Sequence, residues 1–137
     1  EPVRRGTNID NVIKYVSNAQ KKRCTTFIIS DFFDSHDFQQ SLTIASSKHD
    51  IVAIQVYDPR ELQLPDVGFL KVRDAETGEE RWIDTSSKRT RDVYAQWWAN
   101  SNARMKRAFL HSQVDSVSIS TDEDFVPPLL GLFKKRV

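Results

Sequence analysis

The sequence predicts an α/β protein whose parallel strands are joined by right-handed crossovers. Two short and nearly unbroken apolar runs, at residues 24–30 and 51–57, are typical of strands covered on both faces. Stretches with apolar residues at helical spacing alternate with these runs. Because helices that alternate with strands form parallel sheets, this order favours the α/β class. A hairpin signal within residues 68–84 interrupts the alternation and indicates an insertion.

The first half of the chain contributes two predicted helices and two predicted strands. Residues 8–22 form the first helix, because apolar side chains recur on one of its faces. Thr7 is the predicted N-cap of this helix, and the basic run 21–23 closes it, where cations suit the helix dipole. A strand at 24–30, a helix at 38–48 and a strand at 51–57 follow.

The second half begins with the hairpin, whose strands at 69–73 and 80–83 flank a Glu-Thr-Gly-Glu turn. A long helix at 88–112, a third short strand at 116–120 and a last helix at 125–135 complete the pattern. We expect three tryptophans to lie in the core and to join the hairpin to the long helix: Trp82, Trp97 and Trp98.

Composition excludes several classes of protein. The chain has 137 residues, enough for one domain, and 20 Lys+Arg balance 19 Asp+Glu, which argues against a nucleic-acid binder. No apolar run approaches the roughly 18 residues of a membrane span, so we expect no membrane contact. The single cysteine, Cys24, fits a reducing compartment, and we expect a cytoplasmic protein. The chain starts at Glu1 and its one methionine is Met105, so we expect a piece of a longer protein.

Hard oxygen donors gather where the predicted strands end. A helix over 8–22 and a strand over 24–30 have similar lengths, roughly 22 Å and roughly 23 Å. Antiparallel packing of the two therefore brings Thr7 beside Asp31. The other strands end at the same edge, the edge where ligands bind in open α/β sheets. The donors there suit Mg²⁺, Mn²⁺ or Ca²⁺ rather than zinc, although Asp and Thr also cap helices and start turns everywhere: Thr7, Ser30, Asp31, Asp34, Asp58, Thr121 and Asp122.

Several motifs carry a resemblance to known families. Gly-Thr-Asn-Ile at 6–9 and Ser-Asp at 30–31 resemble the second and third metal motifs of a von Willebrand factor A domain. His-Asp at 49–50, Leu-Pro-Asp-Val-Gly at 64–68 and Asp-Ala-Glu-Thr-Gly at 74–78 resemble more closely the bacterial family called domain of unknown function fifty-eight. The resemblance covers almost the whole chain. The Leu-Pro-Asp-Val-Gly stretch and the hairpin are its specific part.

The resemblance implies a fold and a function. The implied fold is a partial Rossmann-like, von Willebrand factor A-like three-layer sandwich with parallel strands and an inserted β-hairpin. The implied function is a non-enzymatic protein-interaction domain with a metal-ion-dependent adhesion site, to which Thr7 and Asp31 contribute. Mg²⁺ or Mn²⁺ is the implied ion, and a MoxR-type AAA+ ATPase is the implied protein partner.

One departure from the family pattern bears on the metal. The first metal motif of A domains, Asp-x-Ser-x-Ser, does not precede Thr7 in this sequence. We therefore expect residues 1–137 to be the C-terminal part of one such domain, with 68–84 as the inserted hairpin, and metal affinity in this fragment to be weak or absent. The apolar strand at 24–30 would then have an open edge, and we expect the fragment to self-associate through it.

A second hypothesis is an enzyme. Carboxylates at this edge support phosphoryl chemistry, so a Mg²⁺-dependent phosphohydrolase or nuclease on a Rossmann-like sheet is the alternative function. Its candidate residues are Asp31, Asp34, Asp58 and Asp122. The sequence offers no nucleophile or general base in a recognisable setting for that chemistry, and this ranks the enzyme below the interaction domain. A scaffold without any ion is the third and weakest hypothesis.

Overall fold

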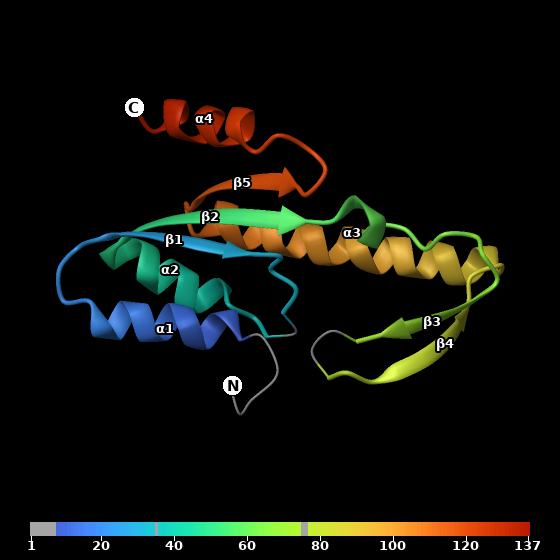
Figure 1. The fold of residues 1–137 in the computed structure, drawn as a ribbon. Coiled ribbons are helices and arrows are strands. Elements are labelled where there is room, and N and C mark those ends of the chain that lie inside the picture. The colour runs from blue at the N-terminus through green and yellow to red at the C-terminus, as the bar shows by residue number, and fades with distance from the viewer. Residues whose placement is uncertain (1–7, 35, 75–76) are drawn as a thin grey trace.

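The computed structural model describes residues 8–34, 36–74 and 77–137, and its elements follow the predicted order (Figure 1). They are α1 Ile9–Ala19, β1 Thr25–Ser30, α2 Gln39–Lys48, β2 Asp50–Tyr57, the 3₁₀ helix η1 Pro59–Glu61, β3 Phe69–Arg73, β4 Glu80–Asp84, α3 Lys88–His111, β5 Asp115–Ser120 and α4 Val126–Lys135. All predicted helices and strands are confirmed, most of them within one residue at each end.

Helix α1 differs from its prediction at both ends. It stops at Ala19 because Gln20 is already extended, so the basic run 21–23 lies beyond the helix. Its N-cap is Asn8, whose Oδ1 accepts a hydrogen bond of 2.9 Å from the backbone N–H of Asn11. The predicted cap, Thr7, was wrong in this role, and Thr7 itself lies outside the described residues. Asn is as good an N-cap residue as Thr. The spacing of the apolar residues therefore cannot tell which of two adjacent polar residues caps the helix.

Three parallel strands form the main sheet in the order β1-β2-β5. Ser30 of β1 lies opposite Gln55 of β2, and Tyr57 of β2 lies opposite Ser120 of β5. The three strands therefore end at one edge of the sheet, which is called the carboxyl edge below (Figure 1). This arrangement confirms the predicted parallel α/β class.

The main core lies between the inner face of the sheet and helices α1, α2 and α3. Side chains alternate between faces along a strand, so Ile28, Ile51 and Ala53 share the inner face. They contact a cluster from the three helices and the loops around them: Ile9, Ile13, Phe32, Phe38, Leu42, Ala45, Met105, Ala108, Phe109 and Val114. Burial of this cluster fixes the helices beneath the carboxyl edge.

Helix α4 covers the opposite, outer face of the sheet only in part. Val52 of β2 is fully buried on this face, whereas Ile29 of β1 is 66% exposed. The ring of Phe27 meets Phe133 of α4 edge-on at 6.2 Å and is still half exposed. The prediction that β1 is covered on both faces was therefore wrong. An apolar run indicates that a strand needs cover, but it does not say which segment supplies it.

The hairpin of β3 and β4 is a separate two-stranded sheet that projects from the body near the start of α3 (Figure 1). Trp82 on the hairpin is 66% exposed and Trp97 on α3 is 54% exposed, whereas Trp98 is buried. The expectation of a shared tryptophan core was thus wrong for two of the three residues. Trp97 instead stacks on Phe33, with 5.6 Å between ring centroids.

Candidate functional site

Asp31 is the first residue after β1 and is exposed at the carboxyl edge. Its Oδ1 accepts hydrogen bonds from the backbone N–H of Phe33 at 3.1 Å and from the hydroxyl of Ser30 at 3.4 Å. The Ser30 hydroxyl in turn accepts from the N–H of Phe32, a residue with φ of 58°. This tight turn orients the Asp31 carboxylate. No donor from the described residues is bonded to its second oxygen, Oδ2.

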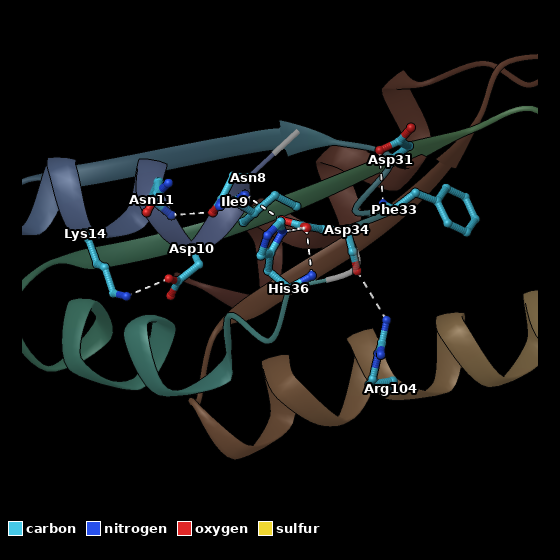
Figure 2. Close-up of polar contacts among 10 residues, drawn as sticks. All are labelled: Asn8, Ile9, Asp10, Asn11, Lys14, Asp31, Phe33, Asp34, His36 and Arg104. Atoms are coloured by element: carbon cyan, nitrogen blue, oxygen red, sulfur yellow. Dashed lines mark hydrogen bonds and ion pairs between the residues drawn. The ribbon is translucent and has the colours of Figure 1, made fainter. Parts of the chain in front are cut away.

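Asp34 has a buried carboxylate that is fully engaged within the protein (Figure 2). Its Oδ2 accepts a hydrogen bond of 2.7 Å from the backbone N–H of Ile9, at the start of α1. Its Oδ1 accepts from the backbone N–H of His36 at 2.9 Å and from the imidazole Nδ1 of His36 at 2.6 Å. Asp34 thus ties the loop after β1 to the N-terminus of α1, the juxtaposition that equal helix and strand lengths predicted.

The surroundings of Asp34 keep it ionised. Burial alone would raise the pKa of this carboxyl, but the hydrogen bonds from the backbone of His36, the backbone of Ile9 and the His36 imidazole outweigh it and hold the pKa below its usual value. The backbone carbonyl of Asp34 also accepts a hydrogen bond of 3.2 Å from the Arg104 guanidinium of α3. These bonds assign Asp34 a structural role at the carboxyl edge.

Two of the remaining predicted donors at this edge, Asp58 and Asp122, engage partners close in sequence. Asp58 caps η1 by accepting from the N–H of Arg60 at 2.9 Å, and the Arg60 guanidinium pairs with the same carboxylate. The hydrogen bonds and charge of Arg60 hold the pKa of Asp58 below its usual value. Asp122 accepts a hydrogen bond from the buried Ser120 hydroxyl, whereas the backbone N–H of Thr121 donates across the sheet to the carbonyl of Tyr57 at 3.0 Å. Such local turns are the ordinary use of Asp and Thr.

The predicted oxygen donors at the carboxyl edge do not converge on one point in the described residues. Figure 2 shows the Asp31 carboxylate directed away from Asp34, which points toward α1. Within residues 8–34, 36–74 and 77–137, no three His, Cys, Asp or Glu side chains form a group that could hold a metal ion. Thr7 lies outside these ranges. Among the described residues, Asp31 offers an open carboxylate oxygen, which suits one ligand position of a hard cation but does not complete a site.

An aromatic cluster beside Asp31 was not predicted as part of the site. The ring of Phe33, two residues after Asp31, stacks on Trp97 and meets Trp98 edge-on at 4.4 Å. Tyr94 lies against Trp97 at 6.1 Å, and its hydroxyl donates to the carbonyl of Glu61 at 2.7 Å. Two consecutive phenylalanines directly after the Asp were the signal in the sequence. The partly exposed Trp97 gives the carboxyl edge an apolar surface next to its open carboxylate.

The structure is a mixed α/β fold whose three-stranded parallel sheet is compatible with a Rossmann-like arrangement, with polar side chains at the carboxyl edge of that sheet. The chain belongs to the family described as "Protein of unknown function DUF58", which matches residues 1–104. This membership confirms the resemblance of the motifs to the domain of unknown function fifty-eight. No solved structure matches the chain significantly.

The similar curated proteins are uncharacterized proteins of mycobacteria. One from Mycobacterium avium is 30% identical over 129 residues, which are 94% of this chain and 76% of that protein. Others from Mycobacterium bovis and Mycobacterium tuberculosis are 30% identical over 117 residues, 85% of this chain but only 37% of their own length. None of the described helices is long and apolar enough to cross a bilayer.

Proposed function

We propose that this chain is part of a non-enzymatic protein-interaction module of the von Willebrand factor A type. The observation that carries the proposal is Asp31, whose carboxylate is exposed at the carboxyl edge, oriented through one oxygen and open at the other. Its neighbours Asp34 and Asp58 are engaged by other groups of the protein. An oriented carboxylate with a free oxygen is a recognition group. A phosphohydrolase or nuclease would need several such carboxylates to converge.

Mg²⁺ or Mn²⁺ is the ion proposed for this site in the intact domain, whereas we expect residues 1–137 alone to bind it weakly or not at all. Asp31 would hold it through Oδ2, and Thr7 is the second proposed ligand, from the segment before α1. An ion bound there would present a coordination position to an acidic side chain of the partner. The Phe33–Trp97 surface beside Asp31 supports the same role, because partly exposed aromatic rings are frequent anchors at protein interfaces.

The proposed partner is a MoxR-type AAA+ ATPase, which the family resemblance suggests. The near-neutral balance of 20 Lys+Arg and 19 Asp+Glu supports a protein partner in preference to a nucleic acid.

A pull-down of the full-length protein with a purified MoxR-type ATPase tests the proposal, because we expect residues 1–137 alone to bind a metal weakly or not at all. We expect retention in Mg²⁺ to be lost with a chelator and in Asp31→Ala. Asp58→Ala is the matched control, since Asp58 is a partly buried carboxylate at the same edge that is already paired with Arg60. Binding by Asp31→Ala at the wild-type level would remove the metal-dependent version. Absence of binding in every condition would remove the ATPase as partner. Mg²⁺-dependent hydrolysis of a generic phosphoester, lost in Asp31→Ala, would instead revive the enzyme hypothesis.

A further inference from the structure

Cys24 and His49 form a thiol–imidazole pair where the strands of the main sheet begin, at the edge opposite the carboxyl edge. Cys24 directly precedes β1, and His49 lies between the end of α2 and the start of β2. The two segments meet there (Figure 1), and the backbone N–H of Asp50 donates to the carbonyl of Cys24 at 2.9 Å. The Sγ of Cys24 lies 3.5 Å from Nδ1 of His49, within reach of a hydrogen bond between thiol and imidazole.

His49 meets its surroundings through one ring nitrogen. The residue is only 3% exposed, yet its other ring nitrogen, Nε2, is buried without a hydrogen-bond partner among the described residues. Buried polar atoms are nearly always bonded, so an unpartnered one needs a reason, and a role in chemistry is such a reason. The polar contact of this ring is the Cys24 thiol. His49 is thus a buried base directed at a cysteine.

The surroundings of the pair favour transfer of the thiol proton to the ring. His49 is the C-cap residue of α2, and its backbone N–H bonds to the carbonyl of Ala45 at 2.8 Å. The negative end of a helix dipole stabilises a positive charge at such a position. The Thr26 hydroxyl lies 3.6 Å from the sulfur and can donate a hydrogen bond to a thiolate. The next carboxylate in the chain, Asp50, is paired with Arg136, which leaves the imidazole to the thiol.

We propose that Cys24 is a reactive thiol activated by His49, and that its substrate is a small hydroperoxide. The thiolate is the nucleophilic form of cysteine, and Nδ1 of His49 is placed to take the thiol proton. The thiol is only partly exposed, which favours a small oxidant over a bulky one. This inference does not depend on the proposed metal site, which lies at the opposite edge of the sheet.

The reaction converts the thiol into a sulfenic acid. The thiolate sulfur attacks the terminal oxygen of the hydroperoxide, so that an S–O bond forms and the O–O bond breaks. The departing oxygen takes the proton from the His49 imidazolium and leaves as water or as an alcohol. Sulfur loses two electrons, and the peroxide gains them. Cys24 is the single cysteine of the 137 residues, so the product cannot close a disulfide within them.

The oxidation rate of Cys24 in the full-length protein tests the proposal. Trypsin releases Cys24 in a peptide of residues 24–48, which ends before His49, so mass spectrometry follows an identical peptide in the wild type and in His49 variants. We expect hydrogen peroxide to oxidise it about tenfold or more faster in the native protein than in urea, because a free thiol is mostly protonated at pH 7. Dimedone traps the sulfenic acid. A native rate equal to or below the rate in urea identifies an inert structural thiol and overturns the proposal.

His49→Asn tests the base itself. Asparagine keeps a polar group near the position of Nδ1 but cannot take the proton, so we expect the advantage of the native state over urea to disappear. His111→Asn is the matched control, because His111 is exposed in the last turn of α3, and it should keep the full advantage. Equal native rates in His49→Asn and the wild type would remove His49 as the activating base. The wild-type comparison with urea needs no variant, so it decides the case even where His49→Asn folds poorly.

Discussion

The buried carboxylate of Asp34 accepts a hydrogen bond of 2.7 Å from the backbone N–H of Ile9, 25 positions earlier in the chain. Ile9 is the first residue of α1, and its N–H has no partner within the helix. The negative charge also suits the positive end of the helix dipole. One side chain therefore satisfies the start of α1 and holds it against the loop that carries Asp31.

We predict that Asp34→Ala lowers the free energy of unfolding by about 2–3 kcal/mol, because the Ile9 N–H and the His36 donors lose a buried, charged acceptor. Urea unfolding followed by circular dichroism measures the change. Asp37→Ala is the control. Asp37 is exposed and makes a similar local bond to the N–H of Gln39 at 3.0 Å, so its loss should cost less than about 1 kcal/mol. Equal losses in the two variants would contradict a special role for Asp34.

The same bonds predict a pH dependence. Asp34 has its pKa below the usual value in the folded state, despite burial, because hydrogen bonds favour the charged form. Its contribution to stability is therefore complete above the unfolded-state pKa, about 3.9, and is lost as the pH falls through the folded pKa. The stability difference between wild type and Asp34→Asn should shrink as the pH drops from about 5 to about 2. Urea unfolding across that range checks this, and a constant difference would refute it.

Arg136 fastens the end of α4 to the sheet, and its removal should loosen that helix. Its guanidinium contacts Asp50 at the start of β2 and Asp115 at the start of β5, both at 2.5 Å. We predict a loss of about 1–2 kcal/mol in Arg136→Ala and only partial recovery in Arg136→Lys, because an ammonium lacks the planar fork that spans two carboxylates.

Chemical unfolding measures these losses, and hydrogen exchange in α4 locates them. The control is Arg60→Ala, which removes an exposed pair with Asp58. A surface ion pair of that kind is screened by solvent, so its loss should cost less than the loss of the Arg136 contacts. A smaller effect for Arg136→Ala than for Arg60→Ala would show that α4 is held by its apolar face alone.

Thr85 anchors the base of the β3–β4 hairpin and is fully buried. Its N–H and its hydroxyl donate to the carbonyl of Gly68 at 2.7 and 2.6 Å, and the hydroxyl oxygen accepts from the N–H of Val67 at 3.1 Å. Thr85→Val keeps the shape but leaves the Val67 N–H without its acceptor. We predict faster amide exchange across β3 and β4, by an amount equivalent to about 1–3 kcal/mol.

Thr85→Ser retains the hydroxyl and should exchange nearly as slowly as wild type. Protection in Thr85→Val equal to that of the wild type would mean that the hydroxyl does not hold the hairpin.

Most of the fold could be predicted from the sequence. Apolar periodicity identified the elements from α1 to α4, and their alternation predicted a parallel sheet, because both depend on side chains close together in the chain. The site was predicted only in outline. Asp31, Asp58 and Asp122 do follow strands that end at one edge. Spacing could not say that Asp34 would turn inward to α1 or that Asp58 would pair with Arg60.

The exposure and the partners of each side chain depend on the tertiary structure, because they are set by the segments packed opposite it. It left Asp31 with an open oxygen beside Phe33 and Trp97, and it left β1 half covered by α4. It also turned Trp82 outward on a hairpin that stands apart from α3. Local periodicity and turn residues are enough to specify which segments are helices and which are strands. The tertiary structure decided which carboxylates are engaged and which apolar surfaces stay open, because these depend on contacts between distant segments.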